Sequence, residues 1–141
     1  MNAEAAPQSA CACFGTDVVL LACSGASNVG HLSDLAAREL TRRGAARMGC
    51  LAGVGGRSPG TLNTLRQARR IVVLDGCGSE CGRHALTDAG FEGFVHLRVD
   101  KMGMKRGETP VTEENVRRLA DAVCRQIAES PASPGNKVTT P

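Results

Sequence analysis

Cysteine is the residue type in this chain with the most chemistry to offer, since seven cysteines occur among 141 residues. Four of them follow apolar runs or open the segment after one: Cys23, Cys50, Cys77 and Cys81. The first three are evenly spaced, about one strand and one helix apart. Four thiolates at tetrahedral corners form a known ligand set for structural zinc. Their position in the fold therefore decides what they can do.

The elements that must position these cysteines alternate along the chain. Apolar runs at 17–22, 45–49, 71–75 and 94–99 are typical of buried strands. Between and after them, helical spacing of apolar residues predicts helices within 27–44, from Ser58-Pro59 onward, within 82–89 and after Thr112. Strands joined through helices predict an α/β domain with a four-stranded parallel sheet. We expect a three-layer, Rossmann-like or flavodoxin-like domain with strand order 2-1-3-4.

Both chain ends differ in composition from this alternating part. Residues 1–14 are small and polar and include Cys11 and Cys13, and residues 130–141 contain three prolines. Such segments bury too little apolar surface to fold, so we expect two disordered tails around a domain at 15–129. The tail thiols are either accessory ligands or incidental.

The carboxyl ends of parallel strands meet at one edge of the sheet, where ligands bind in open α/β folds. We therefore expect the four Sγ atoms of Cys23, Cys50, Cys77 and Cys81 to converge within reach of one metal ion. Spacing alone does not select zinc, because zinc ribbons use C-x2-C knuckles and this chain has C-x3-C between Cys77 and Cys81.

Two other kinds of chemistry suit the same thiols. A redox or sulfur- or metalloid-transfer enzyme would use the Cys77 and Cys81 pair, or Cys23 as a nucleophile. A four-cysteine set also suits an Fe–S cluster, which we rank behind zinc. Single cysteines at strand ends are often small buried hydrophobic residues, and Cys124 on the last helix fits that role.

Several other polar residues fall near the same edge. Asp75 ends the third strand, and we expect it to shape the following loop by accepting hydrogen bonds, with Gly76 allowing a tight turn. Lys101 and Lys105 follow the fourth strand and are candidates to offset thiolate charge. The three histidines also carry metal-ligand chemistry, although we expect His31 and His84 to be surface residues and His96 to be structural.

Composition limits the expected partners. The formal net charge is only +3, Trp and Tyr are absent and Phe occurs three times, so single-stranded nucleic acid would find few stacking surfaces. No run approaches the roughly 20 apolar residues of a membrane span, and the first residues lack a secretory pattern. We expect a cytoplasmic protein whose partner is a metal ion, without nucleic acid or membrane.

The motifs CSG…NVG (23–30), CLAGVGG (50–56), DGCGSEC (75–81) and LRVDKMGMKRG (97–107) occur in this order. The chain thereby resembles the DGC-domain family, a small bacterial and archaeal family named for its Asp-Gly-Cys motif, over about residues 17–128. The resemblance implies zinc bound by four cysteines, which map onto Cys23, Cys50, Cys77 and Cys81. One departure is Asp100-Lys101, where the family is expected to carry Thr-Asp.

Overall fold

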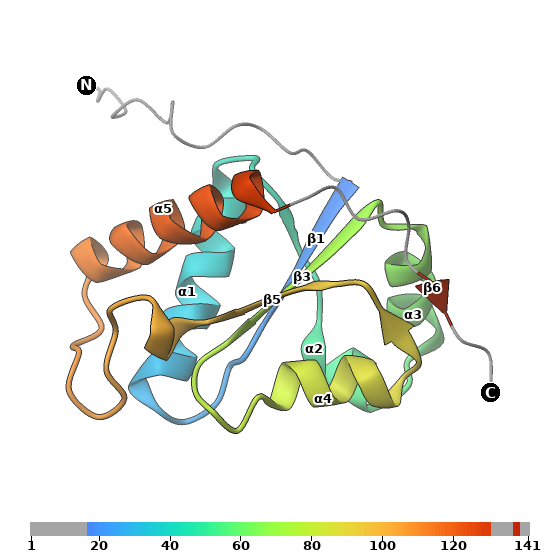
Figure 1. Ribbon diagram of the computed structural model, residues 1–141, viewed down its shortest axis with the longest axis horizontal. Helices are drawn as coiled ribbons and strands as arrows, with labels where there is room; N and C mark the ends of the chain where they lie inside the picture. Colours follow the sequence, from blue (N-terminus) through green and yellow to red (C-terminus); the bar gives the residue numbers. More distant parts are fainter. Residues whose placement is uncertain (1–16, 131–136, 139–141) are drawn as a thin grey trace.

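The computed structural model describes residues 17–130 and 137–138, so the predicted disordered segment 1–14, with Cys11 and Cys13, lies outside it. Strands and helices alternate along most of the described chain, except that α3 follows α2 and β5 follows β4 (Figure 1). The elements in order are β1 (Val18–Ala22), α1 (Asn28–Arg42), β2 (Arg47–Met48), α2 (Leu51–Gly55), α3 (Pro59–Gln67), β3 (Arg70–Asp75), α4 (Cys81–Asp88), β4 (Phe91–Glu92), β5 (Val95–Arg98), a 3-10 turn (Val99–Lys101), α5 (Glu113–Glu129) and β6 (Lys137–Val138).

Four strands form an all-parallel sheet in the order β2-β1-β3-β5. The central pair β1 and β3 places Leu20 opposite Val72, and β3 continues to β5 with Leu74 opposite Leu97. Each connection between these strands contains a helix, which a parallel pair requires in order to return to the same end. The expected α/β class and strand order are confirmed.

The two faces of this sheet carry separate apolar cores. Alternating strand residues such as Leu20 and Leu74 pack with α1 and α5, whereas their neighbours Leu21 and Val73 pack with α2, α3 and α4. Figure 1 shows α1 and α5 together on one side and the other helices on the opposite side. Because both faces are covered, β1 is buried along its whole length and its sequence is apolar throughout.

The longest helices begin where the sequence predicts them to begin. Thr112 caps α5 by accepting the backbone N–H of Asn115 at 3.1 Å, and Ser27 caps α1 by accepting that of Gly30 at 3.1 Å. Such caps satisfy N–H groups that have no partner inside the helix. The start of α1, directly beyond β1, is thus held at the edge that carries Cys23.

Three short elements were not expected from the sequence. Helix α2 has only five residues, LAGVG, and two glycines weaken its helical signal. Strands β4 and β6 form an antiparallel pair, with Phe91 opposite Val138. Strand β6 falls inside the segment 130–141 for which we expected disorder, and residues 131–136 and 139–141 lie outside the described chain. None of the described helices has the length and apolar character to cross a membrane.

Candidate functional site

The four cysteines selected from the sequence all lie at the carboxyl edge of the parallel sheet. Cys23 directly follows β1, Cys50 follows the end of β2, Cys77 follows β3 and Cys81 is the first residue of α4. All four are free thiols, with Cys50 and Cys81 exposed and Cys23 and Cys77 partly buried. Neighbouring strands and their connections therefore place four reduced sulfurs at one end of the domain.

Three of the sulfurs, those of Cys23, Cys50 and Cys77, nevertheless have separate local contacts. The Sγ of Cys23 accepts the N–H of Gly25 at 3.4 Å, and the Sγ of Cys50 caps α2 by accepting the N–H of Gly53 at 3.3 Å. Cys77 packs against the core formed with α1 and α5. These contacts direct the side chains toward their own loops and helices.

The donor set has the chemistry that zinc prefers, but it does not form a closed metal site in this structure. Within residues 17–130 and 137–138, no three His, Cys, Asp or Glu side chains gather closely enough to hold a metal ion. The expected convergence of four sulfurs on one ion is thus not present. A shared sheet edge brings the backbones together, while local hydrogen bonds and packing set the surroundings of the Cys23, Cys50 and Cys77 sulfurs. That these four cysteines bind a metal stays a prediction.

Cys77 is the thiol with the most distinctive electrostatic surroundings. The backbone N–H of Ser79 holds the pKa of Cys77 below its ordinary range, and the Ser79 hydroxyl and the charge of Arg106 act in the same direction. Desolvation and the nearby Asp100 carboxylate oppose this shift. Hydrogen bonds to the charged form favour the thiolate, so this position favours a nucleophilic or metal-binding sulfur.

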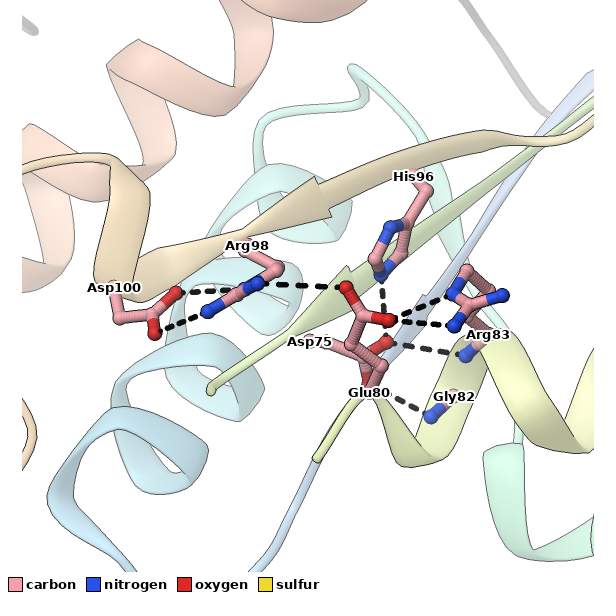
Figure 2. A network of polar contacts seen from close by, with 7 residues as sticks. All are labelled: Asp75, Glu80, Gly82, Arg83, His96, Arg98 and Asp100. Atoms are coloured by element: carbon pink, nitrogen blue, oxygen red, sulfur yellow. Dashed lines mark hydrogen bonds and ion pairs between the residues drawn. The ribbon is translucent and has the colours of Figure 1, made fainter. Parts of the chain in front are cut away.

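Asp75 holds the loop between Cys77 and Cys81 in place. Its side chain is 1% exposed and accepts the N–H groups of Gly82 at 2.7 Å and Arg83 at 3.1 Å, at the first turn of α4. His96 from β5 contacts the same carboxylate through Nε2 at 2.8 Å (Figure 2). The expectation that Asp75 shapes this loop is confirmed, and His96 has the structural role expected of it.

Arg98 extends this network on the other side of the loop. Its guanidinium bonds Asp100 at 2.7 Å and lies 3.5 Å from Glu80, which also pairs with Arg83 at 2.6 Å (Figure 2). Glu80 has φ of 50°, a left-handed conformation that non-glycine residues rarely adopt. Two arginines thus hold the strained residue that directly precedes Cys81.

Gly76 is required for a different reason from the one expected. A Cβ at this position would lie 2.9 Å from the backbone N of Gly30, so the loop after β3 packs directly on the start of α1. The φ of Gly76 is not among the positive ones. Close approach of two backbones, rather than a tight turn, explains the glycine.

Asn28 connects the start of α1 to the loop 105–109. Its amide donates to the carbonyls of Lys105 at 3.0 Å and Thr109 at 2.7 Å, and its carbonyl accepts the N–H of Gly107 at 2.7 Å. This clasp fixes the loop that carries Arg106, whose charge acts on Cys77. The contact brings the NVG motif (28–30) and the MKRG motif (104–107) side by side.

Two of the four thiols open onto one cavity of about 940 Å³. Cys50 and Cys81 line it together with residues of α1 such as Arg38 and Arg42. We call this space, with Cys50, Cys81, Asp34, Arg38, Arg42 and Met48 among its lining residues, the dithiol cavity.

The other residues singled out from the sequence lie as follows. His31, His84, Lys101 and Lys105 are all exposed, as expected for the two histidines. Lys105 is held through its backbone by Asn28 and Thr109. Cys124 is buried in the core with α1, as expected, but it is disulfide-bonded and so differs from the four rim thiols.

Sequence reasoning missed Ser79, Arg106 and the arginines of the dithiol cavity. Ser79 stands between the two cysteines of CGSEC, where a hydroxyl two residues after a thiol is the available signal. Arg106 and Arg38 carry no such signal, because their proximity to the thiols arises from contacts between separate segments.

Comparison with known proteins agrees with this arrangement of motifs. The model of the DGC domain matches residues 19–123. A curated protein of Pseudomonas aeruginosa, named Anaerobic and virulence modulator AnvM, is 38% identical over 88 residues, which are 62% of this chain and 67% of that protein. No solved structure matches the chain.

Proposed function

We propose, from the premise that this chain belongs to the DGC domain family, that it is a metal-binding module specific for a thiophilic ion, zinc in the first place. Family membership supports a metal-binding role. The proposed ligands are Cys23, Cys50, Cys77 and Cys81. The observation that carries the proposal is that every free thiol in the described residues lies at the carboxyl edge of one sheet.

The arrangement without metal implies that the loops must adjust when an ion binds. Cys23 and Cys77 lie in the loops after β1 and β3, which are neighbours in the sheet. Their sulfurs would exchange local contacts for bonds to the ion, and the binding energy would then add to the stability of the fold. A site that forms by such loop movement suits zinc that exchanges with the solution. A site that is already closed suits zinc that is held permanently.

Elemental analysis of untagged protein purified under argon tests this proposal. We expect about one zinc per chain, and a loss of zinc in each of the variants Cys23→Ser, Cys50→Ser, Cys77→Ser and Cys81→Ser. Removal of the metal with a chelator should lower the midpoint of thermal unfolding, because the metal stabilises only the folded state.

The variant His84→Gln is the matched control, since it removes an exposed side chain that can bind zinc and leaves all four rim thiols in place. Zinc content that stays unchanged in all four rim variants contradicts the proposal. Brown protein with visible absorbance and bound iron would instead identify an Fe–S cluster on the same thiols.

A second candidate function is thiol-based redox or sulfur- or metalloid-transfer chemistry at Cys77 and Cys81. The lowered pKa of Cys77, caused first by the Ser79 N–H, favours it. An external disulfide would oxidise the pair by exchange: its S–S bond breaks as an S–S bond forms between Cys77 and Cys81, and its two halves leave as thiols with the two protons. The name of the P. aeruginosa relative, a modulator linked to anaerobic conditions, is compatible with thiols that respond to oxygen.

Alkylation of metal-free protein at a series of pH values separates the two functions. We expect Cys77 to react with the alkylating agent at lower pH than an ordinary thiol does. If no rim thiol titrates below about 8.5, thiol catalysis is contradicted. Both functions require reduced thiols, and we therefore propose a cytoplasmic location and a metal ion as the partner.

A further inference from the structure

The dithiol cavity has the size and shape of a small-molecule site. Its volume of about 940 Å³ falls within the range of about 300–1,000 Å³ that is usual for ligand pockets. It lies beside the ends of β1 and β2, next to the starts of α2 and α4. Ligands of open parallel sheets bind at this edge.

The lining of the cavity combines apolar side chains with two reactive thiols. Met48, Leu51, Ala52 and Ala85 supply the apolar surface. Cys50 and Cys81 are both exposed and reduced, and the N–H of Gly53 holds the Cys50 sulfur at 3.3 Å. Both thiols line the space that a ligand would fill, which favours a molecule that itself reacts with thiols.

The charges at the rim favour a ligand with carboxylates. Side chains of Arg38 and Arg42 are 65% and 70% exposed, whereas those of their partners Asp34 and Glu39 are each 17% exposed. Both oxygens of Asp34 and of Glu39 accept hydrogen bonds from protein donors. An incoming molecule therefore meets guanidinium groups, which bind carboxylates in a forked geometry.

Arg38 has donors left for such a contact. Among the described residues its hydrogen bond to Asp34 uses Nε, and a guanidinium carries five N–H donors in all. Its two terminal nitrogens can thus bind a ligand carboxylate without breaking the pair with Asp34.

We propose that the dithiol cavity binds a small anionic disulfide and that Cys50 reacts with it. The Cys50 thiolate attacks one sulfur of the ligand, and a new S–S bond forms between them as the ligand's own S–S bond breaks. The other half of the ligand leaves as a thiolate and takes up the proton that Cys50 released to solvent. Cys50 is oxidised and the departing half is reduced, so the exchange needs no further oxidant.

This inference does not depend on zinc binding, and its test uses metal-free protein kept in a chelator. Glutathione disulfide is the anionic probe, and the disulfide of glutathione ethyl ester is its matched control with fewer carboxylates. The rate of mixed-disulfide formation at Cys50 is followed by peptide mass spectrometry at low salt and increasing probe concentration.

We expect the rate with glutathione disulfide to saturate, because binding precedes reaction, and to exceed the rate with the ester by about fivefold. The variant Arg38→Gln/Arg42→Gln should remove this preference, and Arg66→Gln, on the exposed surface of α3, should retain it. The variant Cys81→Ser should still form the adduct at Cys50.

A rate that rises linearly and is equal for both probes overturns the proposal. Adducts that form mainly at the partly buried Cys23 or Cys77 overturn it as well, because neither thiol lines the dithiol cavity.

Discussion

The Nε2 atom of His96 lies 2.8 Å from the carboxylate of Asp75, a contact that joins the ends of the neighbouring strands β3 and β5. An ionised carboxylate only accepts hydrogen bonds, so Nε2 donates to Asp75 in the tautomer that carries the proton on this nitrogen. The same carboxylate accepts two N–H groups of α4. One buried side chain therefore connects two strands and the helix that begins with Cys81.

Replacement of Asp75 by Asn should destabilise the fold. The carboxylate now meets three groups, namely the N–H groups of Gly82 and Arg83 and the Nε2 atom of His96. An Asn side chain has only one oxygen to accept hydrogen bonds, and its NH₂ group would face one of these groups instead. We expect a loss of about 2 kcal/mol in the free energy of unfolding, measured by urea titration. Asp88→Asn, exposed on the same helix, should change it little. An unchanged midpoint for Asp75→Asn contradicts the role assigned to this carboxylate.

A methyl group at Gly82 should also be costly. The added Cβ would lie 2.6 Å from Cγ1 of Val73 and 2.8 Å from Oδ1 of Asp75, and Val73 is fully buried. We expect Gly82→Ala to reduce stability by about 1–3 kcal/mol, as measured by thermal or urea unfolding. Gly60→Ala on α3 meets nothing within 4 Å and should be neutral or stabilising by up to about 1 kcal/mol. Equal effects at the two sites would show that α4 can shift away from β3.

Loss of the Ser79 hydroxyl should make Cys77 a weaker acid. The backbone N–H of Ser79, the larger influence, remains in Ser79→Ala, so the pKa of Cys77 should rise part of the way toward its ordinary value. The pH dependence of iodoacetamide labelling at Cys77, read by mass spectrometry in metal-free protein, measures this change. Ser58→Ala is the control, because Ser58 makes no side-chain cap hydrogen bond. If the labelling curve of Ser79→Ala is identical to that of the native chain, the Ser79 hydroxyl does not influence the pKa of Cys77.

Glu39 should make the stability depend on pH at the acidic end. Hydrogen bonding to Arg42, followed by that to Arg43, holds the pKa of Glu39 below its ordinary value of 4.5. Since the folded pKa is the lower one, this stabilisation is present above pH 4.5 and is lost as pH falls through the folded pKa. Glu39→Gln should therefore be less stable than the native chain by about 1 kcal/mol at neutral pH.

The difference between Glu39→Gln and the native chain should shrink as the medium is acidified, and urea unfolding at several pH values measures it. Arg43 also pairs with Asp121 on α5 at 2.7 Å, so the variant should loosen the contact between α1 and α5 as well. Glu108→Gln, in the exposed loop 105–109, serves as control. If the difference in the free energy of unfolding grew toward low pH, the pKa of Glu39 would not be lowered by folding.

Local patterns were sufficient for most of the architecture. The apolar runs of β1 and β3 are strong signals, because a strand that is buried on both faces needs apolar residues throughout. The amphipathic spacing of α1 and α5 is equally strong, because each helix buries one apolar stripe. The weakest signals belonged to α2, β4 and β6, which have five, two and two residues. Elements this short depend on neighbours rather than on their own sequence.

The sequence by itself determined that four cysteines reach one edge of a parallel sheet, since crossover connections bring all carboxyl strand ends to the same side. Only the tertiary structure decided where each sulfur points. Cys50 and Cys81 share a cavity, whereas Cys77 packs toward α1 and α5. Side-chain direction in loops depends on contacts between segments far apart in the chain, such as Asn28 with Gly107, and no local pattern encodes such contacts.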